Sequence, residues 1–272
     1  MQMTHSFVRV LALTVCAVLP TLAAAQQRGA PPPALAPRAA ALIDVTGYWV
    51  AIVDQDWRWR MITAPVGDVA GIPVNAAGRK LAEAWDPAKD QADGKQCKAY
   101  GAGGLMRIPT RLHIYWTDDA TLAIDTDAGQ QQRLLHFGGT PQGEASLQGY
   151  SAANWYKEAQ KAGFGPPTGL AQPGKGGTLK ITTSHLSAGY LRTNGVPYSE
   201  QTTMVEWLDR VDDEGLSYLV LTSVVKDPMY LSDSYVTSYE FKREPDAAKW
   251  HPQPCRIIPP PVKPAKLDPG TL

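Results

Sequence analysis

Nine segments of this chain alternate apolar and polar residues with a period of two, and this pattern constrains the fold more than any other feature. Successive side chains of a β-strand point to opposite faces, so the alternation predicts strands with one buried face. Turn signals such as Asp127-Ala128-Gly129 and Asn194-Gly195 separate several of the segments. The predicted strands are 48–53, 57–63, 111–116, 121–126, 131–137, 178–186, 202–211, 217–225 and 235–242.

A mainly β chain of this kind is expected to form a single antiparallel β-barrel or a strongly curved sheet, because closure removes exposed strand edges. One short helix is predicted at 75–85, where Asn75 can cap the first turn and Asp86-Pro87 ends the pattern. The Gly- and Pro-rich segment 138–177 is longer than an ordinary loop. We expect it to pass over the mouth of the barrel.

The two ends of the chain differ from its centre. Residues 1–25 have the pattern of a cleaved signal peptide, with Arg9, an apolar run from 10 to 22 and Ala23-Ala24-Ala25. The run is too short to predict a membrane span, so we expect no stable membrane insertion and a periplasmic or secreted protein. A flexible leader is predicted at 26–41, the barrel domain at 42–255 and a Pro-rich tail at 256–272.

Charge and cysteine content exclude some functions. Removal of the signal peptide leaves 25 basic and 26 acidic residues without a basic run, so no nucleic-acid partner is expected. Cys97 and Cys255 then remain as one pair, which predicts a disulfide in an oxidising compartment, with free thiols or a metal pair as the alternatives. The absence of CxxC or HxxxH spacing argues against a metal site, and no cofactor is predicted.

The segment 47–61 holds three of the eight tryptophans of the chain. In a strand, its second half would place Asp56, Arg58 and Arg60 on one face and Trp57, Trp59 and Met61 on the other. A charged face inside the barrel would make a polar site. An aromatic face inside would instead make a core with a charged exterior, and the sequence leaves both open.

The start of the predicted domain, Asp44-Val45-Thr46-Gly47-Tyr48-Trp49, resembles the G-x-W motif of lipocalin-like (calycin) barrels. In that family the motif opens the first strand, and its tryptophan packs at the closed end of the barrel beneath an arginine of the last strand. The resemblance implies these roles for Trp49 and Arg243. The string DWRWRM at 56–61 also looks similar to exported bacterial proteins of no assigned function.

Few titratable residues stand out as candidates for chemistry. His113 and Tyr115 share a strand face with Arg111, which favours exposure to solvent, whereas His136 could point into a cavity. Glu206 shares a face with Met204 and Leu208, where a low dielectric would suit a general acid or base.

Tyrosine and tryptophan outnumber phenylalanine, as in cavities that pack a ligand and orient it through a few hydrogen bonds. The leading hypothesis is therefore an exported barrel that binds a small hydrophobic or aromatic molecule in its interior. The alternatives are a metal-independent lyase, isomerase or hydrolase that uses the same cavity, and a structural protein of the cell envelope. The candidate catalytic residues are Asp56, Arg58, His136 and Tyr198, and the candidate ligand contacts are Trp57, Trp59, Arg60, His113, Tyr115, Glu206, Trp207 and Tyr235.

Overall fold

The computed structural model describes residues 34–141, 143–157 and 177–261. Leu35–Leu272 form one compact unit, to which the elements below belong. Its helices are α1 (Trp57–Arg60), α2 (Ala76–Glu83), α3 (Pro87–Ala92), η1 (Gln96–Tyr100) and α4 (Ala102–Leu105). Its strands are β1 (Gly47–Ala51), β2 (Arg111–Trp116), β3 (Thr121–Thr126), β4 (Ala128–Gly129), β5 (Gln132–His136), β6 (Tyr150–Tyr156), β7 (Thr178–Ser184), β8 (Gly189–Arg192), β9 (Val196–Tyr198), β10 (Thr203–Asp213), β11 (Leu216–Lys226), β12 (Tyr235–Glu244) and β13 (Gln253–Pro254).

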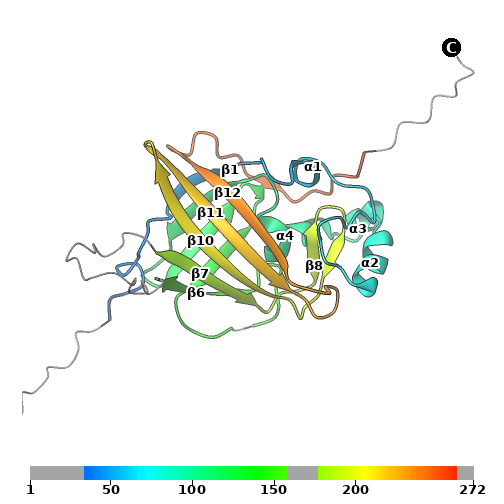
Figure 1. Ribbon diagram of the computed structural model, residues 1–272, viewed down its shortest axis with the longest axis horizontal. Helices are drawn as coiled ribbons and strands as arrows, with labels where there is room; N and C mark the ends of the chain where they lie inside the picture. The colour runs from blue at the N-terminus through cyan, green and yellow to red at the C-terminus, as the bar shows by residue number, and fades with distance from the viewer. Residues whose placement is uncertain (1–33, 142, 158–176, 262–272) are drawn as a thin grey trace, which may run out of the picture. The chain divides into compact units, whose positions relative to one another are not determined.

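Nine of these strands close into a barrel, which confirms the predicted fold class (Figure 1). Their order around the barrel is β1, β12, β11, β10, β7, β6, β5, β3 and β2. Neighbouring strands run antiparallel except β5 and β6, which pair in parallel. Alternate residues of each strand point inward, as the period-two pattern predicts. Their apolar members form one core that includes Trp49, Leu135, Leu179 and Phe241, each fully buried.

The contact expected between Trp49 and Arg243 is present. The guanidinium carbon of Arg243 lies 5.4 Å from the centroid of the Trp49 ring, whose Nε1 donates a hydrogen bond to the Val45 carbonyl at 3.0 Å. Gly47 has a φ of 112°, and a Cβ at this position would lie 3.2 Å from Nη2 of Arg243. Glycine therefore provides both the backbone conformation and the space that the arginine occupies.

We call one end of the barrel the mouth. A group of short helices and strands covers this end, and we call the group the cap (Figure 1). This cap consists of α2, α3, η1, α4, β8 and β9. A second core joins it to the barrel, because Leu191 of β8 and Tyr198 of β9 pack in one cluster with Met204, Val225 and Tyr235 at the ends of β10, β11 and β12. The predicted helix at 75–85 is α2, and the Asn75 side chain accepts a hydrogen bond from the Gly78 amide at 2.9 Å.

The prediction of a strand at 57–63 is wrong. Asp56 has a left-handed backbone conformation with a φ of 53°, and the next four residues form the short helix α1. In this helix the residues no longer divide into a charged and an aromatic face, because Trp57 is exposed and Arg60 is buried. Arg60 donates to the carbonyls of Arg107 and Ile52, at 3.0 Å each. These bonds follow from tertiary packing, which the local alternation could not reveal.

Three further segments contain features that the sequence did not predict. The long segment 138–177 contains strand β6, while residues 158–176 lie outside the described part. The end of the predicted leader is bonded to the barrel, because the Pro37 carbonyl accepts a hydrogen bond from Trp155 Nε1 at 2.8 Å. Near the C-terminus, β13 pairs in parallel with β4 and lies beside the cap.

Candidate functional site

Buried side chains occupy the interior of the barrel, where we expected a ligand. Its polar layer is built on a buried ion pair in which Arg133 and Glu206 are each 1% exposed. Nη2 of Arg133 lies 2.7 Å from Oε2 of Glu206, and Nη1 lies 3.3 Å from Oε1. The hydroxyls of Ser151 and Thr183 accept further hydrogen bonds from Nη2. Glu206 thus faces inward, as its position on β10 indicated, and its carboxylate is engaged by an arginine.

A cavity of about 350 Å³ lies outside the barrel, between the mouth, the cap and the C-terminal segment. We call it the C-terminal pocket. Apolar and aromatic side chains predominate in its lining, which includes Ile62, Trp85, Tyr100, Ile108, Tyr190 and Ile258. Residues 254 and 256–258 form part of the wall. The segment predicted as a Pro-rich tail therefore contributes to a pocket.

One buried carboxylate orients aromatic rings at this pocket. Oδ2 of Asp90 accepts hydrogen bonds from Nε1 of Trp85 at 2.9 Å and from the hydroxyl of Tyr190 at 2.5 Å. Burial, together with the bond to Asp90, raises the pKa of the Tyr190 hydroxyl well above its ordinary value. This hydroxyl therefore remains a hydrogen-bond donor at neutral pH, and the geometry of the wall is fixed.

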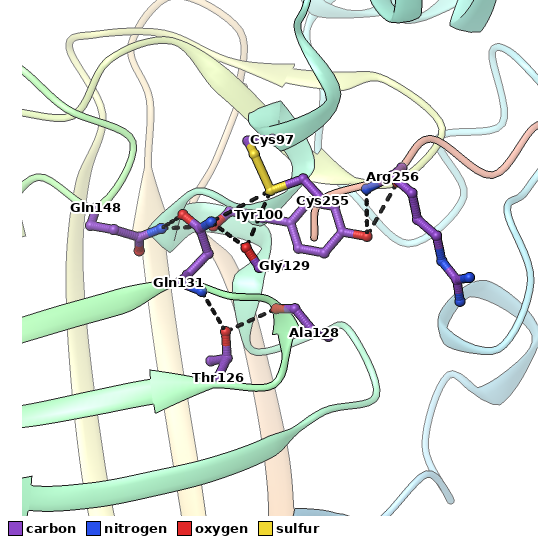
Figure 2. The surroundings of a disulfide bond; sticks show 9 residues. All are labelled: Cys97, Tyr100, Thr126, Ala128, Gly129, Gln131, Gln148, Cys255 and Arg256. Atoms are coloured by element: carbon purple, nitrogen blue, oxygen red, sulfur yellow. Dashed lines mark hydrogen bonds between the residues drawn. A yellow bond between two sulfur atoms is a disulfide. The ribbon is translucent and has the colours of Figure 1, made fainter. Parts of the chain in front are cut away.

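The disulfide between Cys97 and Cys255 is present, as predicted, and it holds the C-terminal wall (Figure 2). In the same place the Tyr100 hydroxyl donates to the Arg256 carbonyl at 3.2 Å. The Gln253 amide donates to the Asp127 carbonyl at 2.7 Å. A covalent bond to η1 of the cap and backbone pairing with β4 thus hold residues 253–256 in place.

A second cavity, of about 300 Å³, opens on the other side of α1 and shares no lining residue with the first. We call it the arginine pocket. Its lining includes Asp56, Trp59, Arg192, Tyr235 and Tyr239.

The arginine pocket lies against a second guanidinium group, that of Arg107. Nη1 of Arg107 donates to Asp56 Oδ2 at 3.1 Å, to the Tyr235 hydroxyl at 2.6 Å and to the Tyr239 hydroxyl at 3.4 Å. Burial and the positive charge of Arg107 both lower the pKa of Arg192. Two cationic groups, Arg107 and Arg192, thus lie at this pocket.

No protein-family model, curated protein or solved structure matches the chain.

In the described residues, no helix is both long and apolar enough to cross a membrane. The same part of the chain contains no group of three or more His, Cys, Asp or Glu side chains arranged to hold a metal ion.

The four candidate catalytic residues do not line one pocket. Asp56 borders the arginine pocket, and Arg58 is exposed, with its guanidinium carbon 5.7 Å from the Trp59 ring centroid. His136 follows the inward-facing Leu135 on β5 and stacks on the ring of Tyr150, 4.9 Å away, on the outer face. Tyr198 is buried in the second core.

The candidate ligand contacts divide in the same way. Trp59 and Tyr235 line the arginine pocket, and Arg60 lines the C-terminal pocket. The others lie elsewhere: Trp57 is exposed, Glu206 is paired with Arg133, and His113, Tyr115 and Trp207 are on the outer face of the barrel. His113 is stacked there between Tyr48 and Tyr115, with ring centroids 4.2 and 4.6 Å apart.

Sequence reasoning missed several residues of both pockets. Arg107 and Arg192 lie in or beside short elements of the cap that carry no periodic signal, although each is at least 96% buried. Ile258 was assigned to the tail. Tyr239 gave the clearest signal, because it follows Tyr235 by four residues on one strand and so points to the same face.

Proposed function

We propose that the protein is exported and binds a small hydrophobic or aromatic molecule, and that this molecule occupies the C-terminal pocket rather than the barrel interior. The observation that carries the proposal is the pocket of about 350 Å³ with its mainly apolar lining. Ligand sites are typically concave, of roughly 300–1,000 Å³, and apolar with a few convergent polar groups.

The aromatic side chains of the pocket support this ligand class. Trp85, Tyr100 and Tyr190 offer ring surface, and rings held in place lose little conformational freedom when a ligand binds. Asp90 fixes two of the three through hydrogen bonds. The candidate acid and base residues are dispersed over the molecule, so we propose binding rather than catalysis.

Export to the periplasm or the exterior is part of the same proposal. The signal-peptide pattern of residues 1–25 supports it, as does the disulfide between Cys97 and Cys255. Disulfides persist mainly in oxidising compartments. The disulfide also holds the C-terminal wall of the pocket in place. The pocket therefore depends on an oxidising compartment in which this bond persists.

Native mass spectrometry of the protein purified from its own host tests the proposal directly. We expect a retained mass that identifies the ligand class.

A probe measurement tests the location of the site. The neutral aromatic dye N-phenyl-1-naphthylamine should bind with increased fluorescence, and Ile108→Trp, which places a larger ring in the pocket, should weaken binding at least about tenfold. Leu134→Trp adds the same side chain on the outer face of β5, where Leu134 is 38% exposed, and should leave binding unchanged. Equal dye affinity in the two variants would refute the location.

A further inference from the structure

We propose that the arginine pocket is a second binding site, which takes the carboxylate group of a small organic acid. This inference concerns a different cavity from the C-terminal pocket, because the two linings share no residue, although Arg60, which lines the C-terminal pocket, also belongs to the arginine cluster. It starts from three arginines that are gathered at the mouth of the barrel.

Arg60, Arg107 and Arg192 are 7%, 4% and 3% exposed. In the described part of the chain, only two carboxylates form ion pairs with them. Asp56 lies 3.1 Å from Arg107, and Asp68 lies 3.9 Å from Arg192. Both carboxylates are partly open to solvent. Burial of a charged group costs free energy unless opposite charge and hydrogen bonds compensate it, so this cluster would gain from a further anion.

Several donor atoms of the cluster have no partner. Among the described residues, Nε and Nη2 of Arg107, Nε of Arg192 and Nη2 of Arg60 form no hydrogen bond, although they are buried. Guanidinium groups can only donate hydrogen bonds, so the chemistry that would complete the cluster is that of an acceptor.

Two tyrosine hydroxyls extend the donor set to the surface of the pocket. The oxygens of Tyr235 and Tyr239 each accept a hydrogen bond from Arg107, which leaves their own protons available. Burial raises the pKa of Tyr239 to about 12 and also raises the pKa of Tyr235, so both hydroxyls stay protonated at neutral pH. Charge-assisted polarisation by Arg107 strengthens them as donors.

The carboxylate of Asp56 indicates which kind of anion fits. It accepts a hydrogen bond from Arg107 at the edge of the pocket, and its side chain is 45% exposed. The carboxylate of a ligand would accept the same hydrogen bond from Arg107 and displace the Asp56 side chain, which can rotate into solvent. Asp56 therefore competes with the ligand in the unliganded protein.

Calorimetric titration of the mature protein with sodium benzoate tests the site, at constant ionic strength and with neutral benzamide as the control. We expect saturable binding of benzoate and none of benzamide. Benzoate should bind equally well to Ile108→Trp, which blocks the other pocket. Loss of binding in that variant, or tighter binding of inorganic phosphate than of benzoate, would overturn the proposal.

Three variants examine the residues. Tyr235→Phe and Tyr239→Phe each remove one hydroxyl and should weaken benzoate binding about ten- to a hundredfold. Tyr115→Phe, on the outer face, should not. Asp56→Asn removes the competing charge at a position that is 45% exposed, keeps a side-chain oxygen that can accept from Arg107, and should tighten binding about three- to fivefold in a variant shown to be folded. Unchanged affinity in Asp56→Asn or in a folded Tyr→Phe variant of the pocket would count against the site.

Discussion

Replacement of Glu206 by Gln should destabilise the barrel far more than an ordinary charge removal. The substitution keeps the shape of the side chain but leaves the Arg133 guanidinium uncompensated at 1% exposure. Removal of one partner of a buried ion pair typically costs about 3–5 kcal/mol, and Gln retains part of the hydrogen bonding, so we expect a loss of about 3 kcal/mol. This is a large fraction of the roughly 5–15 kcal/mol that stabilises a typical domain.

The pair also allows a double-mutant cycle. When Arg133→Met accompanies Glu206→Gln, no buried charge remains without a partner, and the double variant should recover most of the loss, to within about 1–2 kcal/mol of the wild type. Such coupling distinguishes desolvation of a charge from loss of packing.

Equilibrium unfolding in urea measures the effect. With a slope of about 3 kcal/mol per molar, the midpoint of Glu206→Gln should fall by about 1 M. Asp212→Asn breaks the exposed ion pair with Arg210 and should leave the midpoint unchanged. A loss below about 1 kcal/mol for Glu206→Gln, or additive losses in the cycle, would refute the view that this layer is closed to water.

Three further perturbations have defined outcomes. Replacement of Cys97 and Cys255 by Ala should lower the free energy of unfolding by about 4–5 kcal/mol, because their sequence separation of 158 closes a long loop, and should weaken dye binding in the C-terminal pocket. Gly129→Ala should cost about 1–3 kcal/mol in the same assay, since φ is 80° and a Cβ would collide with the Tyr100 ring. Above pH 10 the unfolded chain loses the Tyr239 proton while the native state keeps it up to a pKa of about 12, so stability falls as pH rises. Tyr239→Phe should remove about 2–3 kcal/mol of that fall between pH 10 and 12, and identical pH profiles would contradict the assignment.

The barrel could be predicted from the sequence because the pattern that indicates its strands lies within each strand. Alternation alone gave β2 and β3 with the bounds that the structure has, and it placed Glu206 on the inward face of β10. Asn75 likewise gave the start of α2, because a capping side chain bonds within three residues of itself. The pair Cys97 and Cys255 needed only a count of the cysteines that lie outside the predicted signal peptide.

Both pockets were beyond such reasoning, for a common physical reason. The residues around Arg60 alternate as they would in a strand, although they form the helix α1. The carbonyls that Arg60 bonds belong to residues 52 and 107, which the local pattern does not indicate. The pairing of the C-terminal segment with β4 involves residues more than a hundred positions apart. Such contacts depend on how the cap packs against the mouth of the barrel, and no local sequence pattern predicts this packing.

The odd number of strands in the barrel determines the direction of at least one pair of neighbouring strands. Neighbours in a closed ring can alternate in direction all the way round only if their number is even, so a ring of nine must contain a parallel pair, here β5 and β6. Parallel neighbours cannot be joined by a tight hairpin, and the chain after β5 must travel back before β6 begins. On this return it passes the mouth, where the Leu147 carbonyl accepts a hydrogen bond from the Ala102 amide at 2.8 Å and Gln148 bonds to the Tyr100 carbonyl at 2.8 Å. The odd number of strands thus requires a long β5–β6 connection, and this connection holds the cap through the bonds of residues 147 and 148, so we expect it to resist shortening.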